Sequence, residues 1–206
     1  MSEIMTFGTD NEDIKGGYKK YQGKKGETHR AGFVYSDPKS MFAGAKVHYN
    51  QRYFLCKKTI CCDKQAPRWR VGTVIVLYST DKLGNPKMDP FSYEILPWMF
   101  SEQSYNKLRV ADSEFPLISH DVKITCTNQE YQNLDINSCK ESIWQMKEDF
   151  KKKVLEEAKP VWEHVKKNLA SDLSVEEIKD LISGGTEGGA DPSATNVNLE
   201  DVLKNV

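Results

Sequence analysis

Short apolar runs between residues 34 and 136 alternate with polar turn residues, and this pattern predicts a set of β-strands. The runs are rich in Val, Ile, Tyr, Phe and Thr, which favour pleated and half-buried surfaces. Val71–Tyr78 is almost continuously apolar, as expected of a central strand. The candidate strands are Lys46–Leu55, Trp69–Tyr78, Phe91–Leu96, His120–Thr127 and Glu130–Ile136.

A helical pattern interrupts the strands at Ser101–Ala111, where Ser101 is a suitable N-cap and Tyr105 and Leu108 share one face. Three strands, a helix and two further strands are the element order of an OB-fold, a small barrel that often binds oligonucleotides. The expected fold class is therefore mainly β with helices (α+β), built on a five-stranded OB-fold-like barrel.

A longer apolar stripe with a spacing of three or four residues predicts a second helical region over Ser138–Leu169. Ser138 with Glu141 forms a capping-box motif at its start, and Pro160 is expected to kink or split it. A second capping box, Ser174 with Glu177, precedes a short helix over Val175–Ile182.

Composition divides the chain into four parts. Residues 1–32, which mix Gly and Lys without a period, are expected to form a flexible basic arm, and residues 33–137 an OB-like core. Residues 138–183 form a helical extension, and residues 184–206 a flexible acidic tail. The apolar positions of that tail recur at helical spacing beside acidic residues, which suits docking on a partner protein: Leu199, Glu200, Asp201, Val202, Leu203 and Val206.

The formal net charge of −1 conceals a strong asymmetry. Residues 15–70 carry 14 Lys and Arg against three acidic residues, whereas residues 171–206 carry eight acidic residues and two lysines. A surface of one sign attracts polyanions whatever the total charge of the molecule. The basic segment also holds nine aromatic residues, and single-stranded nucleic acid needs cations for its phosphates and flat rings for its bases.

Two clusters in the basic segment concentrate these residue types. On a strand over Lys46–Leu55, Tyr49 and Tyr53 would share one face, and Arg52 and Phe54 the other. The sequence Arg-Trp-Arg at 68–70 offers a second ring flanked by cations. The residues expected to bind single-stranded DNA are Lys46, Tyr49, Arg52, Tyr53, Phe54, Lys57, Lys58, Arg68, Trp69 and Arg70.

The five cysteines are an odd number and are unevenly clustered, which argues against a disulfide framework and indicates a reducing compartment. His48, Cys56, Cys61 and Cys62 supply four potential zinc ligands within 15 residues, which is the number that a closed structural site needs. Adjacent cysteines on a strand point to opposite sides, so Cys61 and Cys62 could both bind a metal only from a loop. Buried or free thiols are the alternative interpretation.

Catalytic motifs of the phosphate-loop, nucleophile-elbow, zinc-protease and dinucleotide-binding types are missing from the sequence, so a non-enzymatic role is expected. The amino-terminal residues lack the basic and apolar pattern of a signal peptide, and no run of 18 apolar residues indicates a membrane span. These features favour a cytoplasmic location and make a membrane partner unexpected.

The basic aromatic strands, the cysteine-containing insertion before Thr73–Tyr78 and the ending LEDVLKNV resemble the single-stranded DNA-binding (helix-destabilising) proteins of tailed bacteriophages. The segment Ile75–Asp81, followed by GNPKMDPFSYEILPW, is similar to the part of those proteins where a central strand turns into a hairpin. The resemblance implies an OB-fold with a basic aromatic cleft, lined here by Tyr49, Arg52, Tyr53, Trp69 and Arg70. It also implies a location in the cytoplasm of an infected bacterium.

In that family the protein coats single-stranded DNA during replication, recombination and repair, and its acidic tail recruits partner proteins. This chain lacks the C-x2-C pair of the family's zinc site, and Lys15–Arg30 lacks the compact motif that mediates cooperative binding. Two other interpretations of the sequence stay open. One is an RNA-binding or transcription-regulating OB module, and the other is a protein-interaction adaptor or recombination mediator.

Overall fold

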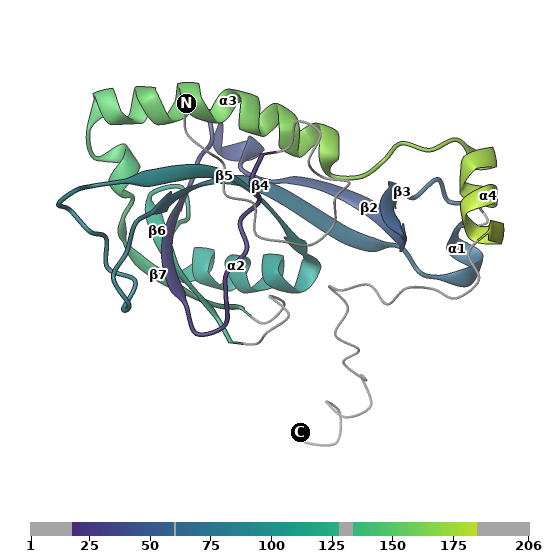
Figure 1. The fold of residues 1–206 in the computed structure, drawn as a ribbon, viewed down its shortest axis with the longest axis horizontal. Helices are drawn as coiled ribbons and strands as arrows, with labels where there is room; N and C mark the ends of the chain where they lie inside the picture. The colour runs from purple at the N-terminus through teal and green to yellow at the C-terminus, as the bar shows by residue number, and fades with distance from the viewer. Residues whose placement is uncertain (1–17, 60, 128–133, 185–206) are drawn as a thin grey trace, which may run out of the picture.

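The computed structural model describes residues 18–59, 61–127 and 134–184. The fold is mixed α+β, with one open antiparallel sheet and helices on both of its faces (Figure 1). The seven strands are β1 (Thr28–Phe33), β2 (Ala43–Asn50), β3 (Arg52–Leu55), β4 (Arg68–Tyr78), β5 (Tyr93–Ser101), β6 (His120–Cys126) and β7 (Leu134–Glu141). The helices are α1 (Cys61–Lys64), α2 (Glu102–Glu114), α3 (Glu148–Asn168) and α4 (Val175–Gly184), with short 3-10 turns at Pro38–Ser40 and Ile143–Gln145.

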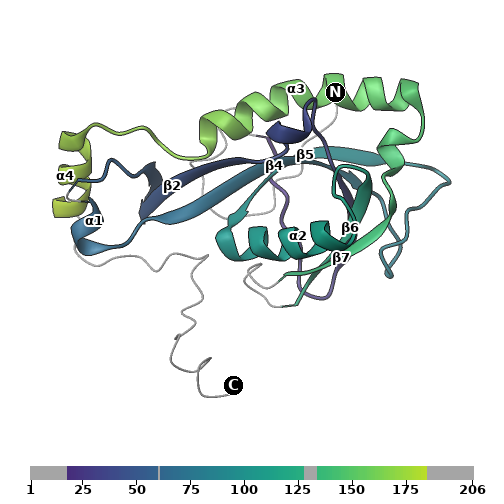
Figure 2. The same ribbon diagram turned by 180° about the vertical axis from the view of Figure 1, so that it is seen from behind.

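Strand β4 is the centre of the sheet, as its continuous apolar run predicts. It pairs with β5 from Arg70 to Tyr78 on one edge, and with β2 and then β1 on the other edge. Strand β6 pairs with β1, and β7 pairs with β6. Among the described residues the strands do not close into a five-stranded barrel. Helix α2 contacts both β5 and β7, and it lies across the open side of the sheet (Figures 1 and 2).

The two faces of β4 belong to two different cores, which explains why its sequence does not alternate. Val71 and Ile75 face α2 in a cluster with Phe33, Trp98 and Leu108. The intervening residues of the strand face α3, in a cluster that contains Val74, Val76, Tyr78, Trp144, Val154, Val161 and Val165. Burial of both faces removes the need for polar residues between the apolar ones.

Helix α3 corrects the predicted second helical region in two respects. It begins at Glu148, because Ser138 and Glu141 belong to strand β7 and do not form a capping box. It also continues through Pro160 as one helix. Ala158 and Val161, two residues before and one residue after this proline, are buried, so tertiary packing holds the helix together despite the lost backbone donor.

A small lobe at one end of the molecule is built from β3, α1 and α4 (Figure 1). Its core consists of Phe54, Cys61, Leu173 and Ile178. The capping box at the start of α4 is confirmed, because the Ser174 amide donates to Glu177 Oε2 at 2.7 Å and the Glu177 amide donates to Ser174 Oγ at 3.1 Å. The predicted single strand Lys46–Leu55 is divided into β2 and β3 by a turn at Gln51, whose φ is +60°.

Strand β1 begins within the stretch that the sequence assigns to a flexible arm. Tyr21, which precedes it, is buried against Trp98, with ring centroids 5.4 Å apart, and its amide donates to Pro97 O at 2.9 Å. The pattern of β1 places Ala31 and Phe33 fully inside the protein. Residues 18–33 are therefore part of the folded body, and residues 1–17 lie outside the described residues.

Candidate nucleic-acid interface and metal centre

The residues predicted to bind nucleic acid lie where β2, β3 and β4 extend from the main body toward the small lobe. The register pairs Lys46 with Trp69 and Tyr49 with Tyr53 on neighbouring strands, and it places Ala45 opposite Arg70. Paired residues share a face of the sheet, so these side chains divide into two sets on opposite faces. The predicted strand residues therefore lie in one region of the sheet, but on both of its faces.

Trp69 lies on the face that also carries Val71, toward α2, and 44% of its surface is exposed. The Lys46 ammonium lies 5.7 Å from the centroid of its ring, within the range of a cation–π contact. The ring also lies against Gly44, where an added Cβ would stand 3.5 Å from it. An indole half open to solvent beside a cation can stack a base and contact a phosphate.

Gly44 is the one member of this arrangement that the sequence did not indicate as functional. The Trp69 ring lies beside Gly44, and a Cβ added at this position would make an ordinary van der Waals contact with the ring. A glycine inside a strand often marks a place where another group approaches closely, and this signal was available in the sequence.

The opposite face carries a cation–π pair that joins the strands to the end of α3. The Arg70 guanidinium lies 3.8 Å from the centroid of the Tyr53 ring, and it donates to Leu169 O at 3.0 Å. The Tyr49 and Tyr53 rings are 4.9 Å apart. Arg70, Tyr49 and Tyr53 are only half-buried, and the two tyrosine rings are tilted by 55° to each other. The arginine of this face is also engaged with the segment that follows α3.

The remaining predicted residues differ in exposure. Phe54 is 1% exposed inside the small lobe, so it cannot stack on a base. Lys57 forms an ion pair with Asp172 of the segment before α4. The other cations of the predicted set are exposed: Arg52, Lys58 and Arg68.

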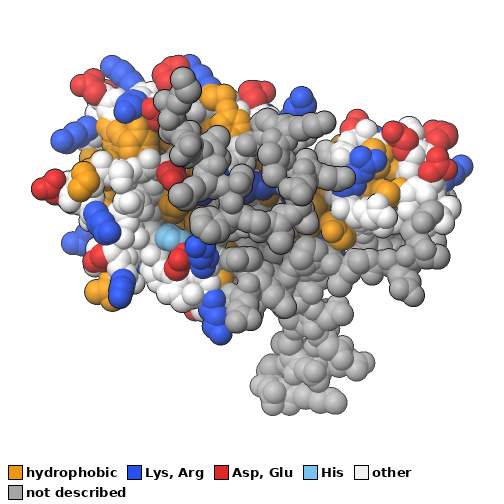
Figure 3. All heavy atoms as spheres, viewed as in Figure 1, with side chains coloured by type: hydrophobic (Ala, Val, Ile, Leu, Met, Phe, Trp, Pro, Cys, Tyr) orange, Lys and Arg blue, Asp and Glu red, His pale blue; other side chains and the backbone are white. Residues whose placement is uncertain are grey.

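Figure 3 shows the face of the molecule seen in Figure 1, with acidic side chains gathered on the outer part of the small lobe, where α4 carries Glu176, Glu177 and Asp180.

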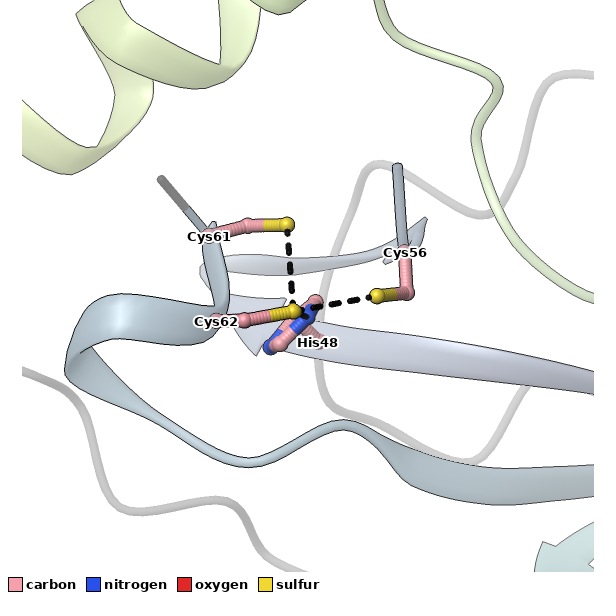
Figure 4. Close-up of side chains that lie close together, drawn as sticks. All are labelled: His48, Cys56, Cys61 and Cys62. Atoms are coloured by element: carbon pink, nitrogen blue, oxygen red, sulfur yellow. Dashed lines mark hydrogen bonds between the residues drawn. The ribbon is translucent and has the colours of Figure 1, made fainter. Parts of the chain in front are cut away.

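His48, Cys56, Cys61 and Cys62 come together in the small lobe, with one ligand atom from each lying within 4.8 Å of all the others (Figure 4). The Cys62 sulfur is 3.4 Å from Cys56 Sγ, 4.0 Å from Cys61 Sγ and 3.7 Å from His48 Nε2. A tetrahedral site with metal–sulfur bonds of about 2.3 Å places its ligand atoms about 3.8 Å apart. The described residues thus form a cluster that could hold a metal ion.

Helix α1 explains how adjacent cysteines can both reach this point. Cys61 and Cys62 begin a single helical turn, in which neighbouring side chains are rotated by about 100° and do not point to opposite sides. Cys56 follows strand β3, and its amide donates to Lys46 O at 2.9 Å, which fixes it beside β2. His48 projects from β2 and stacks on Phe54, with ring centroids 5.6 Å apart.

The electrostatics of the cluster suit a cation. Burial lowers the pKa of His48, which favours the neutral ring that binds metals, and its buried Nδ1 has no hydrogen-bond partner among the described residues. Burial alone would raise the pKa of Cys61, but hydrogen bonds from the backbone of Thr59 and Lys57 lower it overall. The contact with Cys56 raises the pKa of Cys62 to about 12, so the sulfurs disfavour a second negative charge unless a cation lies among them.

The predicted docking residues of the acidic tail, Leu199–Val206, lie outside the described residues. Of the helices in the described part of the chain, none is both long and apolar enough to span a membrane. No protein-family model matches the sequence, and the search of curated proteins likewise gave no match.

Proposed function

We propose that the chain is a non-catalytic single-stranded DNA-binding protein that coats DNA strands during replication, recombination or repair. The observation that carries the proposal is the exposed Trp69 beside Lys46, on strands that also present exposed arginines and lysines. Stacking contributes about 1–3 kcal/mol for each base and tolerates any sequence, which suits a protein that covers whatever strand is exposed.

The strand connections also support the proposal. Strands β1 and β2 both pair with β4, β4 pairs with β5, α2 follows β5, and β6 returns to pair with β1. These pairings support an OB-fold-like arrangement of β1, β2, β4, β5, β6 and β7, because an OB-fold is a partly open five-stranded barrel with a helix between its third and fourth strands. In this interpretation β3, α1 and α4 are additions to the barrel, and Trp69 lies at the boundary between the two.

We further propose that the ion held by His48, Cys56, Cys61 and Cys62 is a structural Zn²⁺. One imidazole and three thiolates form a complete tetrahedral set for zinc, with no position left for a reacting water. The ion would hold the loop after β3 against β2 and would not take part in chemistry. The acidic tail would recruit replication or recombination proteins in the bacterial cytoplasm, as the family resemblance implies.

The test is a titration of the full chain with labelled oligo-dT at 50 and 200 mM salt. Four exposed cations of the predicted set, Lys46, Arg52, Lys58 and Arg68, each on a phosphate, give a slope of about −3 for log affinity against log salt, or about a 50-fold loss between the two concentrations. A matched duplex should bind much more weakly. Equal affinity for duplex and single strand would refute the proposal, and preference for oligo-rU would assign the surface to RNA.

A further inference from the structure

The docking of helix α4 depends on the residues that form the metal centre. We infer that metal binding and α4 docking are coupled, so that loss of the metal loosens α4 from the small lobe. The inference rests on the proposed metal centre but not on the nucleic acid that the protein binds. It gives the ion a regulatory consequence beyond holding the loop after β3.

Helix α4 is held to the protein by a small apolar core. Ile178 is fully buried and Leu173, in the segment before the helix, is 6% exposed, and both pack against Phe54 and Cys61. One side-chain hydrogen bond adds to these contacts, from Asn50 Nδ2 to Leu181 O at 2.9 Å. A helix of ten residues is unstable in isolation, so these contacts decide whether α4 stays in place.

The same contacts are part of the metal centre or touch it directly. Cys61 is one of the four candidate ligands and is 2% exposed because α4 packs over it. Phe54 stacks on the ring of His48, a second candidate ligand. A shift of either ligand on loss of the metal therefore changes the surface on which Ile178 packs.

The loop that carries the cysteines is held at its start by the bond from the Cys56 amide to Lys46 O and by the ion pair of Lys57 with Asp172. Helix α1 is a single turn of four residues, and α4 is the one helix that it contacts substantially within the described structure. In small metal-binding domains the site forms only on folding, so the free energy of metal binding stabilises the folded state. Metal release should therefore loosen α1 and, with it, the surface under α4.

Loss of α4 docking would free the chain that follows Ser171. The chain before α4 is fixed as far as Ser171, whose amide donates to Tyr53 O at 2.9 Å and whose carbonyl accepts from the Leu55 amide. Release of residues 173–184 would add up to about 40 Å to the reach of the segment that follows. Glu176, Glu177 and Asp180 would move with it, toward or away from the basic strands.

Hydrogen exchange on the full chain tests the coupling directly, in the Zn²⁺-loaded protein and after treatment with a chelator. We expect the amides of residues 175–184 to exchange at least about tenfold faster without metal, whereas those of α3 keep their rates. The inference is refuted if α4 exchanges equally fast in the two states.

Coupling is reciprocal, which gives a second test with a matched control. Ile178→Ala removes an apolar contact of α4 without touching a candidate ligand, and it should weaken Zn²⁺ binding about tenfold in competition with a chromophoric chelator. Val154→Ala makes a similar cavity in the core under α3 and should leave Zn²⁺ affinity unchanged. If Ile178→Ala does not fold, Asn50→Ala removes the hydrogen bond to Leu181 and should weaken Zn²⁺ binding several-fold.

Unchanged Zn²⁺ affinity in Ile178→Ala or Asn50→Ala would overturn the coupling while leaving the metal centre intact. Failure of the wild-type chain to bind one equivalent of Zn²⁺, or equal binding by Cys61→Ser, would overturn the metal centre and the coupling together. The nucleic-acid proposal is judged separately, because the oligo-dT titration compares single strand with duplex on the wild-type chain.

Discussion

Replacement of Trp69 by alanine tests the nucleic-acid surface at its most exposed aromatic side chain. The indole is 44% exposed, so a base can reach its ring without any rearrangement of the core. Loss of one stacked base costs about 1–3 kcal/mol, which corresponds to a fall in affinity of about 5- to 150-fold. The adjacent Lys46 should still contact a phosphate, so the salt dependence of binding should change little.

The assay is fluorescence anisotropy of labelled oligo-dT at fixed salt, with circular dichroism to confirm that each variant is folded. Phe115→Ala is the matched control, because Phe115 is an aromatic side chain of similar exposure, 47%, at the end of α2. It should bind as the wild type does. Equal losses for the two variants, or an affinity of Trp69→Ala within twofold of wild type, would refute the assignment of Trp69 as a base platform.

Three further predictions concern stability. Asp121→Ala should cost about 3–5 kcal/mol in urea unfolding, because it leaves Arg30, which donates to Asp121 Oδ2 at 2.8 Å, without its buried partner; a loss below 1 kcal/mol would contradict this. Gly72→Ala should lower stability by about 1–3 kcal/mol in the same assay, because the new Cβ would lie 2.7 Å from Val165 Cγ1. Burial lowers the pKa of His29, despite a nearby glutamate, so its contribution to stability should be lost as pH falls below about 6.5; His29→Gln should flatten that slope.

Much of the sheet could be predicted because its signals are local. The apolar run of β4 and the helix that follows β5 were both predicted, as was the capping box of α4. Strand β7 continues to Glu141, five residues past the predicted end at Ile136, whereas residues 130–133 of the prediction lie outside the described residues. Its last residues, Ser138 and Glu141, look like a helix cap, but pairing with β6 holds them extended. Pairing with a neighbouring strand thus outweighs the local preference of a capping-box sequence for a helix start.

The candidate surface was predicted less completely, because the local sequence does not show which distant segments pack against a strand. Alternation along β2 and β3 correctly separated Tyr49 and Tyr53 from Arg52 and Phe54. It did not show which side chains later segments would cover. Phe54 is buried because α4, more than 120 residues away in sequence, packs onto it, and Arg70 is engaged because α3 ends beside it.

The proposed metal centre and the proposed nucleic-acid surface share strand β2, and this connection has a structural consequence. Lys46 and His48 project from the same face of that strand, two residues apart, one toward Trp69 and the other into the metal cluster. An ion that fixes His48 therefore also fixes the part of β2 that presents Lys46. If α4 leaves with the metal, the acidic side chains of the lobe are released near the same strand. Metal occupancy can thus affect strand binding in two ways, through the geometry of β2 and through the placement of negative charge.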